Sequence, residues 1–376
     1  MKCSGCGACA IICPKHCIKM LNNEEGFLRP VINKDKCVNC NLCKKVCIYN
    51  NCEVNALDSA ALFSAYSSIR KNRETTSSGG VAFEIANDAI LNKMLVCGAV
   101  FDYDTFTVKH KLCLSKKEIE HLKGSKYLQS NCIDGFLETV QNLKENKKLY
   151  AVIFGTPCQI SGLNNVLCHE HIRDRVILVD IFCHGVPSAL LWKRYLEFLW
   201  NKKKIKKNEI QKIIFRDKKY SWHSYYMHIY HKKGEYVKSR KKDPFLKLFS
   251  LGCLNQKECF SCPFRNNSSA DIRLGDFWGK RYDNSEEGYS MVLLLTNRGK
   301  TYFERLSNIE KKSLSIEERF GQQHKDYLVP QNYKLGLKML KDNRDLFKII
   351  NLYDPLLQRI KRELKLEIKK LLNINK

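Results

Sequence analysis

Short apolar runs alternate with amphipathic stretches through the middle of the chain, from about residue 79 to residue 330. Apolar runs bounded by turn residues predict buried strands, and apolar positions three and four apart predict helices. The predicted helices cover 81–95, 133–143, 158–167 and 190–200. The predicted strands cover 95–101, 149–154, 176–182, 210–215, 225–230, 271–274 and 291–295. Alternation of this kind favours an α/β domain.

The two ends of the chain follow different patterns. Residues 1–55 are dense in cysteine and lack long apolar periodicity, so we expect them to form a separate unit, joined by a linker at 56–78. Residues 331–376 are predicted to be a basic helical tail. Its apolar positions at helical spacing are Leu357, Ile360, Leu364, Ile368 and Leu371. Packing on its own domain or on a partner subunit is the commoner role of such a helix, and the alternative is peripheral contact with an anionic membrane surface.

Composition narrows the class of protein. The chain has 376 residues, 19 cysteines and a formal charge of +26. No apolar run reaches the ~18 residues of a membrane span, and the N-terminus does not resemble a secretory signal, so a cytoplasmic location is expected. The excess charge is mostly lysine, which fits a solvated surface, the docking of an acidic electron carrier or an anionic membrane. No nucleic-acid-binding signature is present, and no nucleic acid is expected as a partner.

A cysteine pattern occurs twice within the first fifty residues. Both copies have the form C-x2-C-x2-C-x3-C, offset by about 34 residues. In two-cluster ferredoxins with this spacing, the fourth cysteine binds the other 4Fe–4S cluster. The first set of ligands is therefore Cys3, Cys6, Cys9 and Cys47. The second set is Cys37, Cys40, Cys43 and Cys13. The alternatives are a disulfide framework and a structural zinc site, and zinc sites rarely use three cysteines in such a run. Two further cysteines, Cys17 and Cys52, are expected to be small core residues.

A second group of cysteines lies in the α/β region. Cys158 and Cys183 each follow a predicted strand, and residues at the carboxyl ends of neighbouring parallel strands meet at one edge of a sheet. Cys259 and Cys262 form a third C-x2-C pair, which needs two more ligands to hold a metal. Spacing alone leaves three readings open, namely a third 4Fe–4S cluster, a zinc site and unligated core thiols.

Other polar residues lie in loops beside these elements. Ser77–Gly80 precedes a predicted helix, where backbone N–H groups suit a phosphate or a plain helix cap. His184 follows Cys183 and is either a proton donor or a structural histidine. Asp276 is either a cofactor or substrate ligand or a turn residue, and Trp222 and His223 are weaker candidates for lining the same site.

Six stretches in order resemble the beta subunit of coenzyme F-420 hydrogenase and its dehydrogenase relatives. They are SSGGV (77–81), GSKY (124–127), GTPCQ (155–159), CHGVPS (183–188), CFSCPF (259–264) and ADIRLGDFWG (270–279). The resemblance implies an α/β domain over 79–330 that binds FAD beside a 4Fe–4S cluster. It assigns that cluster to Cys158, Cys183, Cys259 and Cys262. It places the flavin phosphates near Ser78, Gly79, Gly80, Ser125 and Lys126.

These observations predict an iron–sulfur flavoprotein oxidoreductase for electron transport. Electrons would pass between a one-electron carrier, two N-terminal clusters, a third cluster and a flavin that exchanges a hydride with an organic substrate or cofactor. The alternative is a non-catalytic electron-transfer subunit serving a separate enzyme, for which the family association suggests surface-polysaccharide biosynthesis. The sequence does not choose among ferredoxin, flavodoxin, a reduced nucleotide and a deazaflavin as redox partner, and it identifies no catalytic residue.

Overall fold

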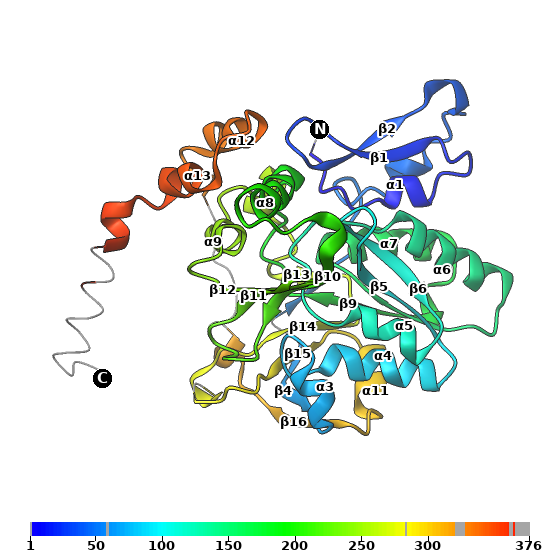
Figure 1. Ribbon diagram of the computed structural model, residues 1–376. Coiled ribbons are helices and arrows are strands. Elements are labelled where there is room, and N and C mark those ends of the chain that lie inside the picture. The colour runs from blue at the N-terminus through cyan, green and yellow to red at the C-terminus, as the bar shows by residue number, and fades with distance from the viewer. Residues whose placement is uncertain (1, 58–59, 283, 320–327, 361–363, 365–376) are drawn as a thin grey trace.

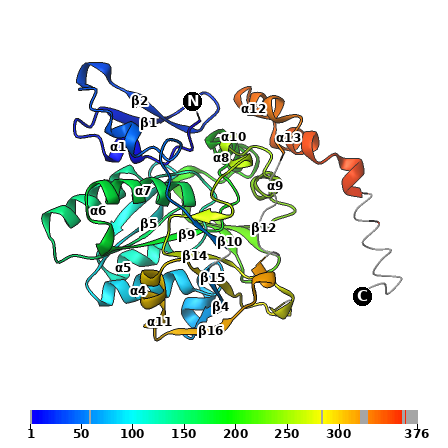
Figure 2. The same cartoon turned by 180° about the vertical axis from the view of Figure 1, so that it is seen from behind.

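The computed structural model describes residues 2–57, 60–282, 284–319, 328–360 and 364. The N-terminal unit contains two short helices, α1 (Ala8–Ile11) and α2 (Leu42–Lys45), and an antiparallel pair of strands, β1 (Ile18–Asn22) and β2 (Leu28–Ile32). It lies against the main body beside helix α7 (Figures 1 and 2). Buried Ala8 and Ile11 of α1 pack in the same core cluster as that helix, so the unit is docked rather than tethered.

The main body is built on a nine-stranded mixed sheet. Its strand order is β16-β4-β15-β14-β9-β8-β5-β6-β7, and the pairs β14–β9, β9–β8, β8–β5 and β6–β7 are parallel. The strands are β4 (Ala61–Ser67), β5 (Leu95–Asp102), β6 (Thr107–Cys113), β7 (Ser130–Asn131), β8 (Ala151–Phe154), β9 (Val176–Ile181), β14 (Ile272–Asp276), β15 (Ser290–Leu294) and β16 (Ile309–Ser313).

Helices cover both faces of this sheet because its central strands are apolar on both sides. Ala151 and Ile153 of β8 face α6 (Ile133–Glu145) and α7 (Pro157–His169), whereas Val152 faces the opposite layer. That layer contains α4 (Val81–Leu91), α5 (Lys116–Ile119) and α11 (Asn297–Glu304). The result is a three-layer α/β arrangement (Figure 1).

A second lobe packs beside the sheet around a core of aromatic and aliphatic side chains. A three-stranded antiparallel sheet of β10 (Ile210–Asp217), β11 (Tyr226–His231) and β12 (Gly234–Ser239) forms one side of it. The helices of this lobe are α8 (Ala189–Lys202), α9 (Pro244–Leu251), α12 (Tyr333–Lys341) and α13 (Leu346–Tyr353). The smaller elements of the chain are α3 (Arg70–Glu74), α10 (Lys257–Phe260), β3 (Asn55–Ala56) and β13 (Asn267–Ser268).

The expected α/β alternation is present, with one difference. Residues 56–78, expected to be a linker, instead contain β4 and α3, and β4 pairs with both β15 and β16 inside the large sheet. Of the predicted basic tail, α12 and α13 are described, whereas most of its predicted apolar stripe lies outside the described residues. None of the helices in the described ranges has the length and apolar content that spanning a bilayer requires.

Candidate redox centre

The cysteines of the N-terminal unit lie close to one another. Electrostatic interactions link Cys9 with Cys3, Cys43 and Cys47, and Cys6 with Cys158, Cys9 and Cys3. Cys13 lies in a small core cluster with Cys9, Cys37 and Cys43 packed against it, so the division into two ligand sets stays a prediction. Within the described residues, no three Cys, His, Asp or Glu side chains converge as a single metal ion requires. A four-iron cluster differs from such a site, because it spreads its cysteines over several iron atoms.

The two additional cysteines differ from each other. Cys17 is buried, as expected, and its Sγ lies 3.4 Å from Cys13 Sγ. Cys52 is exposed, and its Sγ lies 3.2 Å from Ser161 Oγ, so the expectation of a core position is wrong for this residue.

A third group of cysteines lines a cavity at the carboxyl edge of the large sheet. Cys158 lies in the first turn of helix α7, Cys183 follows β9, Cys259 lies in α10, and Cys262 lies just after it. All four line one cavity together with Ser4 and Gly5 of the N-terminal unit. Burial raises the pKa of Cys183 to about 12 and that of Cys262 to about 11. Free thiols here are therefore protonated, and binding of iron would displace their protons.

Local structure explains how these four cysteines are held. Pro157 occupies the first turn of α7, where its missing N–H costs nothing, and Thr156 caps the helix through Gln159. Gly185 adopts a φ of 96°, and a Cβ at this position would lie 2.5 Å from Asn255 Nδ2. The Asn255 side-chain amide donates to the His184 carbonyl oxygen at 3.0 Å. The Cys183 loop is thus fixed against the segment that carries Cys259.

Two glutamines fasten the N-terminal cysteines to this cavity. Gln256 is fully buried and its Nε2 donates to the Cys3 carbonyl oxygen at 2.9 Å. Gln129 accepts from Leu28 N at 3.0 Å, and its Nε2 lies 3.4 Å from the Ser4 carbonyl oxygen. These contacts bring the first predicted ligand set next to the Cys158 group. Their sequence signal is weak, since a lone glutamine has no distinctive spacing.

A second site, with polar and aromatic side chains, lies where the SSGGV, GSKY and ADIRLGDFWG stretches come together. Arg216 at the end of β10 is buried and forms an ion pair with Asp276 at the end of β14. Its guanidinium lies between the rings of Tyr225 and Trp278, at 5.1 and 5.2 Å. Arg216 Nε and Nη2 and Asp276 Oδ1 are buried and have no hydrogen-bond partner. Unpaired buried polar atoms cost free energy, so this pair is suited to a polar ligand.

The SSGGV and GSKY loops are walls of the same site. Ser125 donates to Ser77 Oγ through its backbone N–H at 2.7 Å, which joins the two loops. Lys218, two residues after Arg216, donates to the carbonyl oxygen of Ser78 at 2.7 Å. Tyr127 interacts electrostatically with Arg216 and Asp276. The electrostatic surroundings of His184 also include Asp276 and Arg216, which connects this site to the Cys183 loop.

The residues predicted to contact the flavin phosphates form hydrogen bonds with other groups of the protein. Gly79 N donates to Ser290 Oγ at 3.1 Å, Gly80 caps α4 with a φ of 87°, and Ser78 Oγ donates to the Tyr289 carbonyl oxygen. Lys126 Nζ donates to the carbonyl oxygens of residues 121–123, and burial lowers its pKa to about 7. These groups therefore fix the two loops in place.

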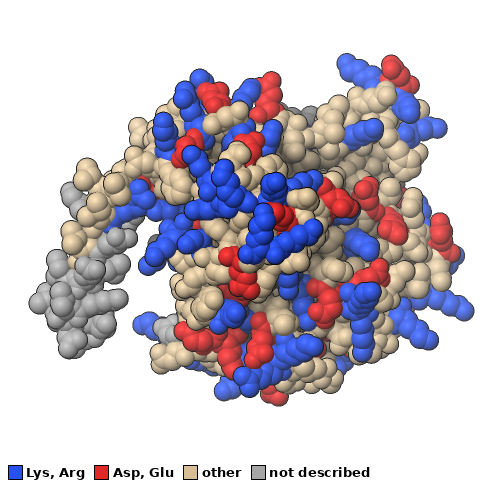
Figure 3. Space-filling view, viewed as in Figure 1, with Lys and Arg blue, Asp and Glu red and all other residues tan. Residues whose placement is uncertain are grey.

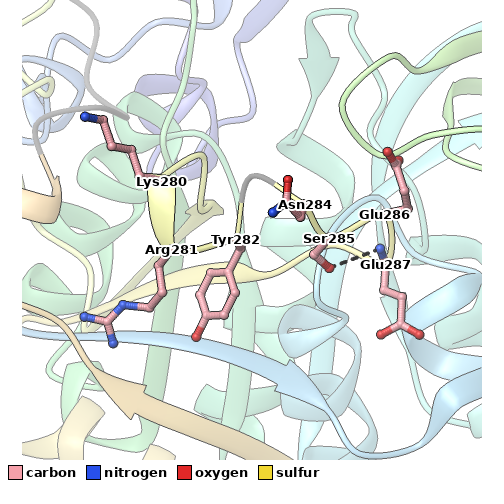
Figure 4. Close-up of a pocket in the computed structure, with 7 residues that line it drawn as sticks. All are labelled: Lys280, Arg281, Tyr282, Asn284, Ser285, Glu286 and Glu287. Carbon is pink, nitrogen blue, oxygen red and sulfur yellow. Dashed lines mark hydrogen bonds between the residues drawn. The ribbon is translucent and has the colours of Figure 1, made fainter. Parts of the chain in front are cut away.

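A surface hollow is lined by residues 280–282 and 284–287 (Figure 4). Glu286 accepts from the backbone N–H of Trp222, and Trp222 stacks on Trp278 at 4.4 Å. His223 Nε2 lies 3.0 Å from the Ser285 carbonyl oxygen. Trp222 and His223 therefore support the wall behind Arg216 and Trp278.

Two protein-family models match this chain, one over each of its two cysteine-rich regions. Residues 148–318 match the C-terminal part of the beta subunit of coenzyme F420 hydrogenase/dehydrogenase, and residues 2–51 match a 4Fe–4S dicluster domain. The beta-subunit region contains Arg216, Asp276 and all four cysteines of the cavity, and the dicluster region contains the eight N-terminal cysteines. The chain is therefore an iron–sulfur electron-transfer protein related to these beta subunits.

Similarity to known proteins extends over most of the chain. An uncharacterized protein of Methanocaldococcus jannaschii is 24% identical over 346 residues, covering 81% of this chain and 86% of that protein. A solved chain from the F420-reducing [NiFe] hydrogenase complex of Methanosarcina barkeri is 18% identical, with a TM-score of 0.47, and the match covers 77% of this chain and 91% of that chain.

Proposed function

We propose that the protein is an iron–sulfur flavoprotein oxidoreductase, which exchanges electrons between a one-electron carrier and an organic substrate or cofactor. The observation that carries the proposal is the buried Arg216–Asp276 pair, whose unpaired polar atoms lie near a cavity lined by four cysteines. The beta-subunit relationship of residues 148–318 supports a redox role for this region.

The cavity cysteines fit a 4Fe–4S cluster. Four thiols from three separate segments reach one space, and Ser4 and Gly5 close it on the side of the N-terminal unit. Three ligand sets, of which the first adjoins the third, would give a continuous route for single electrons. In this assignment the third set is Cys158, Cys183, Cys259 and Cys262.

The Arg216–Asp276 pair fits the polar edge of a flavin ring. That edge presents carbonyl oxygens and one N–H, so it needs both donors and an acceptor. Arg216 offers Nε and Nη2 as donors, and Asp276 offers Oδ1 as an acceptor. A flavin bound here would supply the conversion between single electrons and a hydride. Arg216 and Asp276 would hold and orient the ring, and Trp278 and Tyr225 would keep the guanidinium in place.

Contacts with the phosphate part of FAD belong to the same proposal. Ser78, Gly79, Gly80 and Ser125 lie in the two loops that adjoin this site. Lys126 and Lys218 are the cations of this wall, and both donate to backbone carbonyl oxygens, Lys218 to those of Ser78 and Glu287. Burial lowers the pKa of Lys218 to about 8, and an anionic phosphate would favour its charged form.

Binding of FAD to anaerobically reconstituted protein tests the proposal. Arg216→Gln removes two donors aimed at the ring and should weaken FAD binding ~10-fold or more, because a hydrogen bond to a charged group contributes about 1.5–3 kcal/mol. Arg240→Gln is the matched control, since Arg240 also stacks on Tyr225, at 5.4 Å, but from an exposed position. Iron content and circular dichroism monitor folding of both variants.

Two results would contradict the proposal, and they differ in the part of it that they contradict. Wild-type protein that carries iron and sulfide but binds no flavin would support the non-catalytic electron-transfer subunit instead. Equal losses of FAD affinity in the Arg216 and Arg240 variants would contradict the assignment of the ring site.

A further inference from the structure

The outer end of the N-terminal unit is formed by three segments that surround the second predicted ligand set. The segments are 13–17, 33–41 and α2. Asn33 N donates to the Cys17 carbonyl oxygen at 2.8 Å, and Cys37 and Cys43 pack against Cys13 and Cys17. This end projects from the main body at the upper right of Figure 1.

The second ligand set is the one that reaches the surface. Cys40 is the exposed member of the twelve predicted ligands, whereas the other eleven are buried or half-buried. Val38, between Cys37 and Cys40, is 57% exposed. An apolar side chain at the centre of a polar surface is a common feature of protein interfaces. The separation between a cluster and a docked electron carrier is therefore smallest at this end, where electrons can enter or leave the protein.

Five lysines lie within three residues of Cys13, Cys37 or Cys43 along the chain. They are Lys15, Lys34, Lys36, Lys44 and Lys45, and all five are exposed. The stretches 12–22 and 27–52 contain a single acidic residue, Asp35. In Figure 3 blue side chains project from this end of the molecule, at the upper right. A 4Fe–4S cluster with four thiolates carries a charge of about −2, so the lysines keep this end positive when it is loaded.

We propose that this surface, named here the lysine collar (Lys15, Lys34, Lys36, Lys44 and Lys45 around Val38 and Cys40), is the docking site for a small acidic one-electron carrier protein. Of the proposed function, this inference requires only one part, the cluster held by Cys13, Cys37, Cys40 and Cys43. Opposite charge steers the two proteins together, and the small apolar centre allows rapid release. One electron leaves the reduced carrier and reduces this cluster, or takes the reverse path.

The test measures docking and electron transfer separately. Anaerobic protein is mixed with an acidic ferredoxin, and in a second series with an acidic flavodoxin, at low ionic strength. The second-order rate constant of cluster reduction and the affinity for the immobilised carrier are both measured. The variant Lys34→Glu/Lys36→Glu should lower each by ~10-fold or more, and the difference from wild type should shrink at high salt, where charges are screened.

The matched control is Lys116→Glu/Lys117→Glu, which makes the same change of charge at two exposed lysines of α5. This variant should bind and react like wild type. Equal effects of the two double variants, or an unchanged rate in Lys34→Glu/Lys36→Glu, would overturn the proposal. So would a collar variant that loses only its binding to vesicles containing anionic lipid. Cluster reduction is followed by the absorbance of the clusters themselves, so protein that fails to bind flavin still gives an answer.

Discussion

Arg273 connects the buried end of the sheet to the loop that follows Cys262. It lies on β14, is 1% exposed and forms a two-point ion pair with Asp180 of β9, at 2.7 and 2.6 Å. Its remaining donors reach the carbonyl oxygens of Phe264 and Asn267. One guanidinium therefore holds two neighbouring strands and the turn beyond the third C-x2-C pair.

Arg273→Met should destabilise the protein by about 3–5 kcal/mol, because Asp180 is left buried without its partner. Iron content should also fall by about four atoms per chain as the loop carrying Cys259 and Cys262 loosens. Chemical denaturation and iron analysis measure the two effects. Arg305→Met, which breaks the more exposed pair with Asp88, should cost only about 0–1 kcal/mol. Similar losses in both variants would contradict the role given to Arg273.

His110 gives the protein a specific sensitivity to acid. It is buried, its ring contacts Ser130 Oγ and the Phe154 carbonyl oxygen, and burial lowers its pKa from 6.5 to about 4. Between these pH values the unfolded chain binds a proton that the folded protein excludes. Stability is therefore lost as the pH falls from 6.5 towards 4.

His110→Gln removes this titrating group and should make the free energy of unfolding less dependent on pH over that interval. Urea denaturation at several pH values, with wild type measured in parallel, isolates the contribution of His110 from acid effects on the clusters. If the free energy of unfolding changes with pH in the same way for both proteins, His110 does not make this contribution.

Among the elements, the strand–loop–helix units were the most predictable. The strand before Cys158 is apolar, and the strand before Cys183 is apolar apart from Asp180, as buried parallel strands require. Pro157 and Ser188 mark the helix starts that follow. Strand β4 was missed because the serines and threonines after it suggested a linker. Strand β16 is polar along its exposed edge, and its sequence contains no period that distinguishes it from a loop.

Helix α7 is the element on which the N-terminal unit docks. A Cβ at Gly162 would lie 3.0 Å from both Ala8 Cβ and Cys6 Sγ. Gly→Ala in a helix normally stabilises by about 1 kcal/mol, whereas Gly162→Ala should destabilise because it forces α1 away from α7.

Chemical denaturation and the rate of proteolysis within residues 1–55 measure this effect. Gln141→Ala, at an exposed position of α6, should change stability by no more than about 0.5 kcal/mol. A more stable Gly162→Ala variant with unchanged proteolysis would show that the contact between α1 and α7 is unimportant.

At the scale of the whole molecule, the cysteines carry a clearer sequence signal than the polar site around them. Thiols at short, repeated spacing have few other uses, so the ligand sets could be proposed without a structure. Arg216 gave a weaker signal, since an arginine that ends a strand is usually exposed. Its burial depends on Asp276, Tyr225 and Trp278, which come from distant segments. Long-range packing of this kind has no local pattern that could be recognised in one sequence.

The central claim is that three clusters lead to one flavin, and analysis of iron, inorganic sulfide and flavin in a single oxygen-free preparation tests it most directly. The account predicts about twelve iron atoms, about twelve sulfides and about one flavin per chain, since each 4Fe–4S cluster holds four of each inorganic atom. About eight iron atoms with no flavin would contradict it, because the Cys158 group and the Arg216–Asp276 pair would then hold neither cofactor.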